Sequence, residues 1–191
     1  LYYKSLTDSN VGMSRSDFFI FIKPDKEKRT LTISDNGIGM TKEELEQNLG
    51  TIAHSGTLNF KNDNELKDDI EIIGQFGVGF YSAFMVSKKV VVISKAYGEE
   101  KAYRWESSGA DGYSIEETEK DTVGTDVILE IKDNKGEDNY DEFLEQHRLV
   151  ELVKRYSDYI RYPIKMEITK TRLKEQSENE KDMAPEYESY T

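Results

Sequence analysis

The sequence contains no cysteine among its 191 residues, which excludes disulfide bonds and zinc sites built on thiolates. No apolar stretch approaches the roughly 20 residues that a membrane-spanning helix requires. We find no signal peptide at its start and no run of lysine and arginine that would bind an anionic membrane. These absences predict a chain of the reducing cytoplasm that has no membrane partner.

Negatively charged side chains outnumber positively charged ones in this chain. The formal net charge is −12, and charged side chains make up 34% of the residues. Because an acidic chain repels the phosphates of DNA and RNA, this balance argues against a nucleic-acid partner. Hydrophobic residues make up 36%, which is enough for one core, so length and composition predict one domain followed by a tail.

Hydrophobic periodicity predicts a mixture of strands and helices. Strands are expected at 17–23, 29–34, 90–94, 102–106, 113–117, 125–131 and 164–168. Helices are expected at 41–50, 80–86 and 139–160. The first two strands are spaced as a hairpin, and the strands between 90 and 131 are spaced as an antiparallel meander. The predicted fold class is α+β, a two-layer sandwich of a mostly antiparallel sheet with helices on one face.

Two of the expected helices have clear boundary signals. Thr41 and Glu44 have the spacing of a capping box at the start of the first helix. Asn139 is expected to cap the long helix, and Pro163 is expected to follow its end.

The sequence DNGIGM at 35–40 lies between a strand and the first of these helices. Asp35 could accept hydrogen bonds from an amino group such as the exocyclic amine of adenine. Gly37 and Gly39 would let a flat base approach the backbone closely, and Met40 offers a soft apolar contact. A tight turn without a ligand is the alternative, because Asp, Asn and Gly all favour turns. The segment is therefore a candidate ligand pocket.

A second glycine-rich sequence, GQFGVGF at 74–80, comes directly before a helix. Three glycines in six residues expose successive backbone N–H groups, and a helix N-terminus adds partial positive charge. Together these features suit a phosphate. The spacing matches neither Walker A nor the dinucleotide fingerprint, and a glycine-rich turn without a ligand remains the alternative.

A long polar segment, 51–69, separates the two glycine-rich sequences, and long loops in compact domains are often functional lids. Hydrogen-bonding groups and hinge glycines in or beside it are Asn48, Thr51, His54, Ser55, Gly56 and Thr57. A mobile segment between a base-binding turn and a phosphate-binding turn could close over a nucleotide. A solvated loop is the alternative.

Three strings in this order, SDNGIGMTKEEL, NLGTIAHSGT and IGQFGVGFYSAFMV, resemble the motifs of the heat-shock protein 90 chaperone family. GTDVILEI and YSDYIRYPI resemble later segments of that family, so the resemblance runs from about Leu1 to about Thr171. The amino-acid sequences of these motifs are more similar to the bacterial form, high-temperature protein G, than to the eukaryotic cytosolic form. The resemblance implies the N-terminal ATP-binding domain of an ATP-dependent chaperone, with the GHKL-type ATPase fold.

The resemblance also implies a split site for ATP or ADP under a mobile lid. Asp35 would bind the adenine amine directly and through water near Gly39, Met40 would contact the base, and Thr125 would join the water network. The sugar and lid side would be formed by Asn48, Leu49, His54, Ser55 and Gly56. The phosphate side would be formed by Gln75, Phe76, Gly77, Val78, Gly79 and Phe80. His54 stands where the family often has lysine, and histidine is mostly neutral near pH 7.

The family's catalytic glutamate and its magnesium-binding asparagine lie on a helix that would precede Leu1. We therefore expect that the chain lacks the N-terminal strand and the first helices of the family's domain. We expect no catalytic residue and no metal-binding residue in this sequence. We also expect negligible ATP turnover by this chain alone. Residues 1–170 would form the ATP-binding domain, and the charged residues 171–191 a linker toward a middle domain. The parent protein would be a homodimer that uses ATP, Mg²⁺, unfolded client proteins and possible co-chaperones.

Two other classes compete with the chaperone. A sensor kinase should carry a phosphoacceptor histidine region, and a topoisomerase subunit should carry a basic surface, yet this chain has two histidines and is acidic. A binding module that keeps the pocket without hydrolysis would differ from the chaperone in lacking the upstream glutamate and asparagine.

Overall fold

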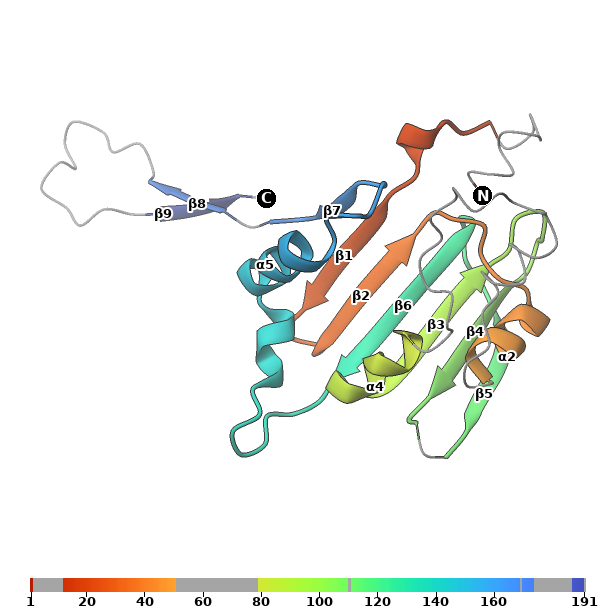
Figure 1. Ribbon diagram of the computed structural model, residues 1–191, viewed down its shortest axis with the longest axis horizontal. Helices are drawn as coiled ribbons and strands as arrows, with labels where there is room; N and C mark the ends of the chain where they lie inside the picture. Colours follow the sequence, from red (N-terminus) through yellow and green to blue (C-terminus); the bar gives the residue numbers. More distant parts are fainter. Residues whose placement is uncertain (2–11, 51–78, 110, 169, 174–186, 191) are drawn as a thin grey trace, which may run out of the picture.

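A seven-stranded sheet forms the centre of the computed structural model, which describes residues 1, 12–50, 79–109, 111–168, 170–173 and 187–190 (Figure 1). Its strands are β1 (Ile20–Asp25), β2 (Thr30–Asp35), β3 (Ser87–Lys95), β4 (Ala102–Ser107), β5 (Tyr113–Thr118), β6 (Gly124–Ile131) and β7 (Ile164–Met166). The order is β5-β4-β3-β6-β2-β1-β7, and every pair is antiparallel except β1 with β7. The predicted mostly antiparallel sheet is confirmed.

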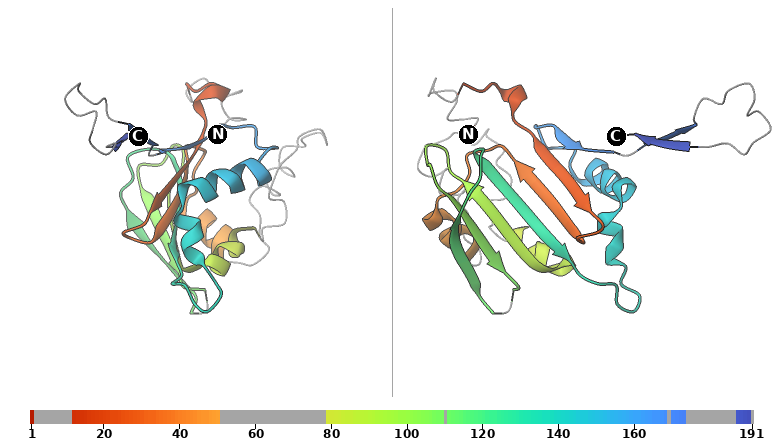
Figure 2. Two further views of the ribbon diagram at one scale, coloured as in Figure 1. Left: turned by 90° about the vertical axis from the view of Figure 1, so that its left-hand side faces the viewer. Right: turned by 180° about the vertical axis from the view of Figure 1, so that it is seen from behind.

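The helices gather on one face of this sheet (Figure 2). They are α2 (Lys42–Gly50), α4 (Ala83–Val86) and α5 (Gln146–Tyr156). The chain also has the 3-10 turns η2 (Arg15–Asp17), η3 (Gly79–Ser82) and η4 (Tyr140–Leu144). The core lies between the two layers and includes Leu45, Val90, Trp105 and Ile131, each at most 2% exposed. The predicted two-layer α+β sandwich is therefore confirmed. Among the described residues, no helix is both long and apolar enough to span a bilayer.

The start of α2 follows the predicted capping box. The Glu44 carboxylate accepts a hydrogen bond from the Thr41 N–H at 2.8 Å, and the Thr41 hydroxyl accepts one from the Glu44 N–H at 3.3 Å. Two N–H groups that a helix start leaves without helical partners are thereby satisfied. The cap fixes where α2 begins, directly after the turn at 35–40.

The predicted meander is only partly right. Strands β3, β4 and β5 follow one another in the sheet, but β6 lies on the other side of β3, between β3 and β2. Val90 and Val92 of β3 and Leu129 of β6 are almost fully buried beneath the helices. An apolar strand such as β6 gains more by lying in the centre of the sheet than by extending the exposed edge at β5.

The prediction of one continuous helix at 139–160 is wrong, because the structure has two separate elements there. A 3-10 turn, η4, and the helix α5 are separated at Glu145, whose backbone is extended with φ −89° and ψ 120°. Asn139 makes no side-chain cap. The helix expected at 80–86 is likewise a 3-10 turn followed by the single turn of α4.

The C-terminal segment contains a separate two-stranded sheet of β8 (Lys170–Leu173) and β9 (Tyr187–Tyr190). The sequence predicts a linker there and does not predict these strands. The division into residues 1–170 and 171–191 stays a prediction.

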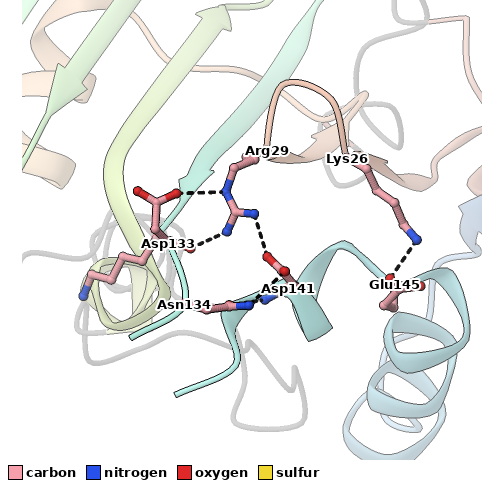
Figure 3. A network of polar contacts seen from close by, with 7 residues as sticks. Lys26, Arg29, Asp133, Asn134, Asp141 and Glu145 are labelled. Atoms are coloured by element: carbon pink, nitrogen blue, oxygen red, sulfur yellow. Dashed lines mark hydrogen bonds and ion pairs between the residues drawn. The ribbon is translucent and has the colours of Figure 1, made fainter. Parts of the chain in front are cut away.

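A network of polar contacts centred on Arg29 explains the break between η4 and α5 (Figure 3). The Arg29 guanidinium donates to the Asp141 carboxylate at 2.6 Å and to the Lys132 carbonyl at 2.7 Å, and it pairs with Asp133 at 3.3 Å. Asn134 donates to the other oxygen of Asp141 at 2.9 Å. These contacts hold the start of η4 against the β1–β2 hairpin, so the chain must turn before α5 can begin.

The charge of Asp141 should stabilise the fold in a pH-dependent way. The hydrogen bond from Arg29, followed by that from Asn134, holds the pKa of Asp141 below its ordinary value. A carboxyl group with a lowered native pKa stabilises the folded state above its unfolded pKa, and this stabilisation is lost as the pH falls through the native pKa. Asp141→Asn should therefore lower the melting temperature at pH 7, and the difference from wild type should shrink below about pH 4.

The matched control is Lys101→Met, which removes the exposed ion pair of Lys101 with Glu117 at 2.7 Å, far from Asp141 in the sheet. Exposed pairs contribute little, so its melting temperature should stay close to that of wild type. An Asp141→Asn deficit that is the same at pH 7 and at about pH 3 would contradict the assignment.

Candidate functional site

Three polar side chains form a row across the end of the sheet that lies beside the turn at 35–40. The strand register pairs Asp35 of β2 with Thr125 of β6, and Thr125 with Ser94 of β3. The next row under the helices, Ile33, Val127 and Val92, is apolar. A polar row on an otherwise apolar face marks this end of the sheet as the place where a ligand could be recognised.

Hydrogen bonds connect this row to the turn. The Ser94 hydroxyl accepts a hydrogen bond from the Met40 N–H at 2.8 Å, and it lies 2.8 Å from the Thr125 hydroxyl. Ser94 is 0% exposed and Thr125 is 7% exposed. Two buried hydroxyls thus tie Met40, just before α2, to the centre of the sheet.

Close backbone approaches explain two glycines of the site. Gly39 has φ +69°, and a Cβ atom there would lie 1.9 Å from the carbonyl oxygen of Lys95. Gly124 has φ +125°, and its Cβ would lie 2.1 Å from the carbonyl oxygen of Asp35. The chain itself therefore requires glycine at both positions, which is a different reason from the approach of a base that the sequence suggests for Gly39.

Asn36 anchors the turn to the segment before β1. Its amide oxygen accepts from the Phe19 N–H at 2.9 Å, and its amide nitrogen donates to the Asp17 carbonyl at 2.8 Å. One side chain thus satisfies both a donor and an acceptor of the neighbouring backbone. The sequence predicts Asn36 only as a turn former.

The carboxylate of Asp35 is held in place on one side. Its Oδ1 accepts from the Gly37 N–H at 2.8 Å, while the side chain keeps access to solvent. Desolvation by the surrounding protein raises the pKa of Asp35 above its ordinary value, the Gly37 N–H opposes this, and the charge of Asp126 adds to it. Lys120 donates to Asp126 at 2.5 Å and also lowers the pKa of Asp35. Asp35 thus stands exposed at the end of β2, with one N–H on its carboxylate, and the charges of Asp126 and Lys120 act on its pKa in opposite directions.

The remaining predicted site residues that the structure describes lie around α2 and η3. The Asn48 amide donates to the Met40 sulfur at 3.9 Å. Leu49 is 8% exposed, and its carbonyl accepts from the Tyr81 hydroxyl at 3.1 Å. The Phe80 ring packs edge-on against Trp105 with centroids 5.4 Å apart. The side chains of Leu49 and Phe80 thus belong to the core, so a ligand contact from these residues would come from the backbone.

Part of the predicted site cannot be compared with the structure. His54, Ser55, Gly56, Gln75, Phe76, Gly77 and Val78 lie outside the described residues. Gly79 is the first residue of η3. Sequence reasoning missed Ser94, although Ser94 does end the apolar run of β3 at 90–93.

Gly39→Ala should move the turn, because the added methyl group would meet the backbone of Lys95 rather than a flexible side chain. Gly98→Ala is the matched control, since Gly98 has φ +89° but nothing within 4 Å of its Cβ position. We expect Gly98→Ala to cost about 1–2 kcal/mol of unfolding free energy for the left-handed conformation alone. Gly39→Ala should cost about 1–3 kcal/mol more, the range for overpacking. Urea unfolding measures both, and equal losses would show that the turn can move freely away from β3.

Known families match most of the chain. The family described as "Histidine kinase-, DNA gyrase B-, and HSP90-like ATPase" matches residues 10–135, and the family "Hsp90 protein" matches residues 142–190.

Individual relatives agree with these families. The chain is 63% identical to "Chaperone protein HtpG" of Bacillus subtilis over 94% of this chain and 29% of that protein. It is 59% identical to "Chaperone protein HtpG" of Clostridium perfringens strain 13 over 99% of this chain and 30% of that protein. The chain thus spans about 30% of the length of the curated relatives it matches. It belongs to the histidine kinase-, DNA gyrase B- and HSP90-like ATPase family, within the heat-shock protein 90 branch.

Proposed function

We propose that this chain binds ATP and ADP, and that the polar row of Asp35, Thr125 and Ser94 recognises the adenine base. The observation that carries the proposal is the position of Asp35. Its carboxylate stands at the end of β2, beside a turn that Met40 and Gly39 fasten to β3. An acceptor in a rigid, partly desolvated place can discriminate between ligands, because it leaves a mismatched group unpaired.

The chemistry of Asp35 favours adenine over guanine. An ionised carboxylate only accepts hydrogen bonds. Adenine carries an amine donor at the position where guanine carries a carbonyl oxygen, so guanine would place an acceptor against an acceptor. Met40 supplies a polarisable contact beside the base, and Asn48 holds the sulfur of Met40 in place. The pocket should therefore be selective for adenine nucleotides.

The phosphates would lie at the second glycine-rich sequence. We propose that backbone N–H groups of Gly77, Val78, Gly79 and Phe80 hold them, since successive N–H groups favour an anion. His54, Ser55, Gly56, Gln75 and Phe76 would complete the site from the lid and the loop. Mg²⁺, bound by the phosphates, would neutralise their charge. The expectation that this chain alone turns over little ATP stays a prediction.

For the longer protein, we propose an ATP-dependent chaperone. The relatives are named chaperone proteins, and the family is one of ATPases. Nucleotide binding and lid closure would drive a cycle of a homodimer that assists client proteins, with possible co-chaperones, in the cytoplasm. This conclusion rests on the family and not on the described site alone.

Asp35→Asn should abolish measurable binding of Mg-ADP in a calorimetric titration of the full chain. The Gly37 N–H already occupies Oδ1 at 2.8 Å, so an asparagine would keep its carbonyl oxygen there and present its NH₂ donors to the adenine amine. Asp25→Asn is the matched control, because Asp25 Oδ1 accepts from the Lys28 N–H at 2.9 Å in the hairpin turn at the other end of β2. Wild-type affinity in Asp35→Asn would refute the pocket, as would GDP binding as tightly as ADP.

The affinity for adenine ligands should fall in acid at a higher pH than an ordinary aspartate predicts. Desolvation raises the pKa of Asp35, and the base requires the ionised form. Binding should therefore weaken as the pH falls through this raised pKa, before the ordinary value of about 4. ADP and adenosine should be titrated in parallel, because phosphate also titrates near pH 6. A decline seen for ADP and not for adenosine would contradict the role of Asp35.

A further inference from the structure

Ser94 is an unusual residue for its position. The inward-facing residues that precede it on β3, Val90 and Val92, are 0% and 1% exposed, and Ser94 itself is 0% exposed. A hydroxyl buried this deeply is unfavourable unless it is hydrogen-bonded. A small apolar residue would fill the same space and would need no hydrogen-bond partner. Packing alone therefore does not explain why a hydroxyl stands at this position.

The hydrogen bonds of Ser94 are directional. The hydroxyl has one proton to donate and two lone pairs. One lone pair accepts from the Met40 N–H at 2.8 Å. The proton can go to the Thr125 hydroxyl at 2.8 Å or to the Gly124 carbonyl at 3.4 Å. The shorter distance favours Thr125, because hydroxyl hydrogen bonds lie near 2.7–2.8 Å in general.

The direction of this hydrogen bond decides what Thr125 can do. If Thr125 accepts the proton of Ser94, its own proton must be donated to another group. Thr125 pairs with Asp35 on its other side, across the β2–β6 register. The proton of Thr125 is thus available on the side of the row that carries Asp35, where a ligand or a bound water could accept it.

We propose that Ser94 is a positioning residue for base recognition, acting through Met40 and Thr125. It fixes the N–H of Met40, and with it the turn at 35–40, and it orients the Thr125 hydroxyl as a donor beside the Asp35 acceptor. The site would then present one donor and one acceptor side by side, which is a pattern that a purine edge can match. This inference rests on the proposed binding of adenine nucleotides.

The test compares Ser94→Thr with Ser94→Val, because threonine and valine have the same shape and differ in the hydroxyl. Both add the same methyl group to the buried site, so any effect of crowding is shared. Ser94→Thr should bind Mg-ADP within a few-fold of wild type. Ser94→Val should bind about tenfold more weakly or worse, the ratio that one hydrogen bond of ordinary strength supplies.

A second measurement needs no ligand. In the free protein, amide hydrogen exchange at Met40 should be faster in Ser94→Val than in Ser94→Thr, because only the hydroxyl accepts the Met40 N–H. Ser107→Ala is the control for a buried serine elsewhere in the sheet. Ser107 is 8% exposed and its hydroxyl accepts from the Gly109 N–H at 3.0 Å, so this variant should leave ADP affinity unchanged.

The outcomes separate the two proposals. If the wild type does not bind Mg-ADP or adenosine, the proposed function fails. If the wild type binds and Ser94→Val binds equally well, the role of Ser94 is refuted while the function stands. Equal Met40 exchange rates in the two variants would also refute it, even if both bind weakly.

Discussion

The register of three adjacent strands is the constraint on which the candidate site depends. Because β2, β6 and β3 pair as they do, Asp35, Thr125 and Ser94 fall in one row on the face that carries the helices. Side chains alternate between the faces of a sheet, so a slip of one residue in β6 would turn Thr125 to the opposite face. The apolar rows next to it prevent such a slip, since Val127 and Leu129 would leave the core together with Thr125. The core thereby sets the position of the polar groups.

The turn after β2 is held against the neighbouring strands by close backbone contacts more than by hydrogen bonds. Gly39 lies against the backbone of Lys95, and Gly124 lies against that of Asp35. The Ile38 carbonyl accepts from the Tyr97 N–H at 2.8 Å, which joins the turn to the end of β3. At the opposite end of the sheet, the Arg29 network holds the hairpin and η4 together (Figure 3). The two ends are thus fixed by different means, with little freedom left for the strands between them.

Local signals predicted local structure well. The capping box of Thr41 and Glu44 and the hairpin of β1 and β2 follow from neighbouring residues. Asp35 and Thr125, which the family strings indicate as site residues, stay predictions. The place of β6 did not, because it depends on which strand edge buries more apolar surface. The break before α5 was not predictable either, since Arg29 and Asp141 lie 112 residues apart. Ser94 was missed for the same reason: its partners, Met40 and Thr125, are distant in the sequence.

An acidic chain that binds a nucleotide must recognise the base with a carboxylate and must keep that carboxylate away from the phosphates. Asp35 is useful for an amine only when it is ionised, and an ionised carboxylate repels phosphate. Desolvation raises the pKa of Asp35, and the charges of Asp126 and Lys120 act on this pKa in opposite directions. A nucleotide can satisfy this arrangement only if its base lies at the polar row and its phosphates lie at another segment, as the second glycine-rich sequence allows. In the proposed site, this electrostatic conflict is a reason for binding the base and the phosphates at two different stretches of the chain.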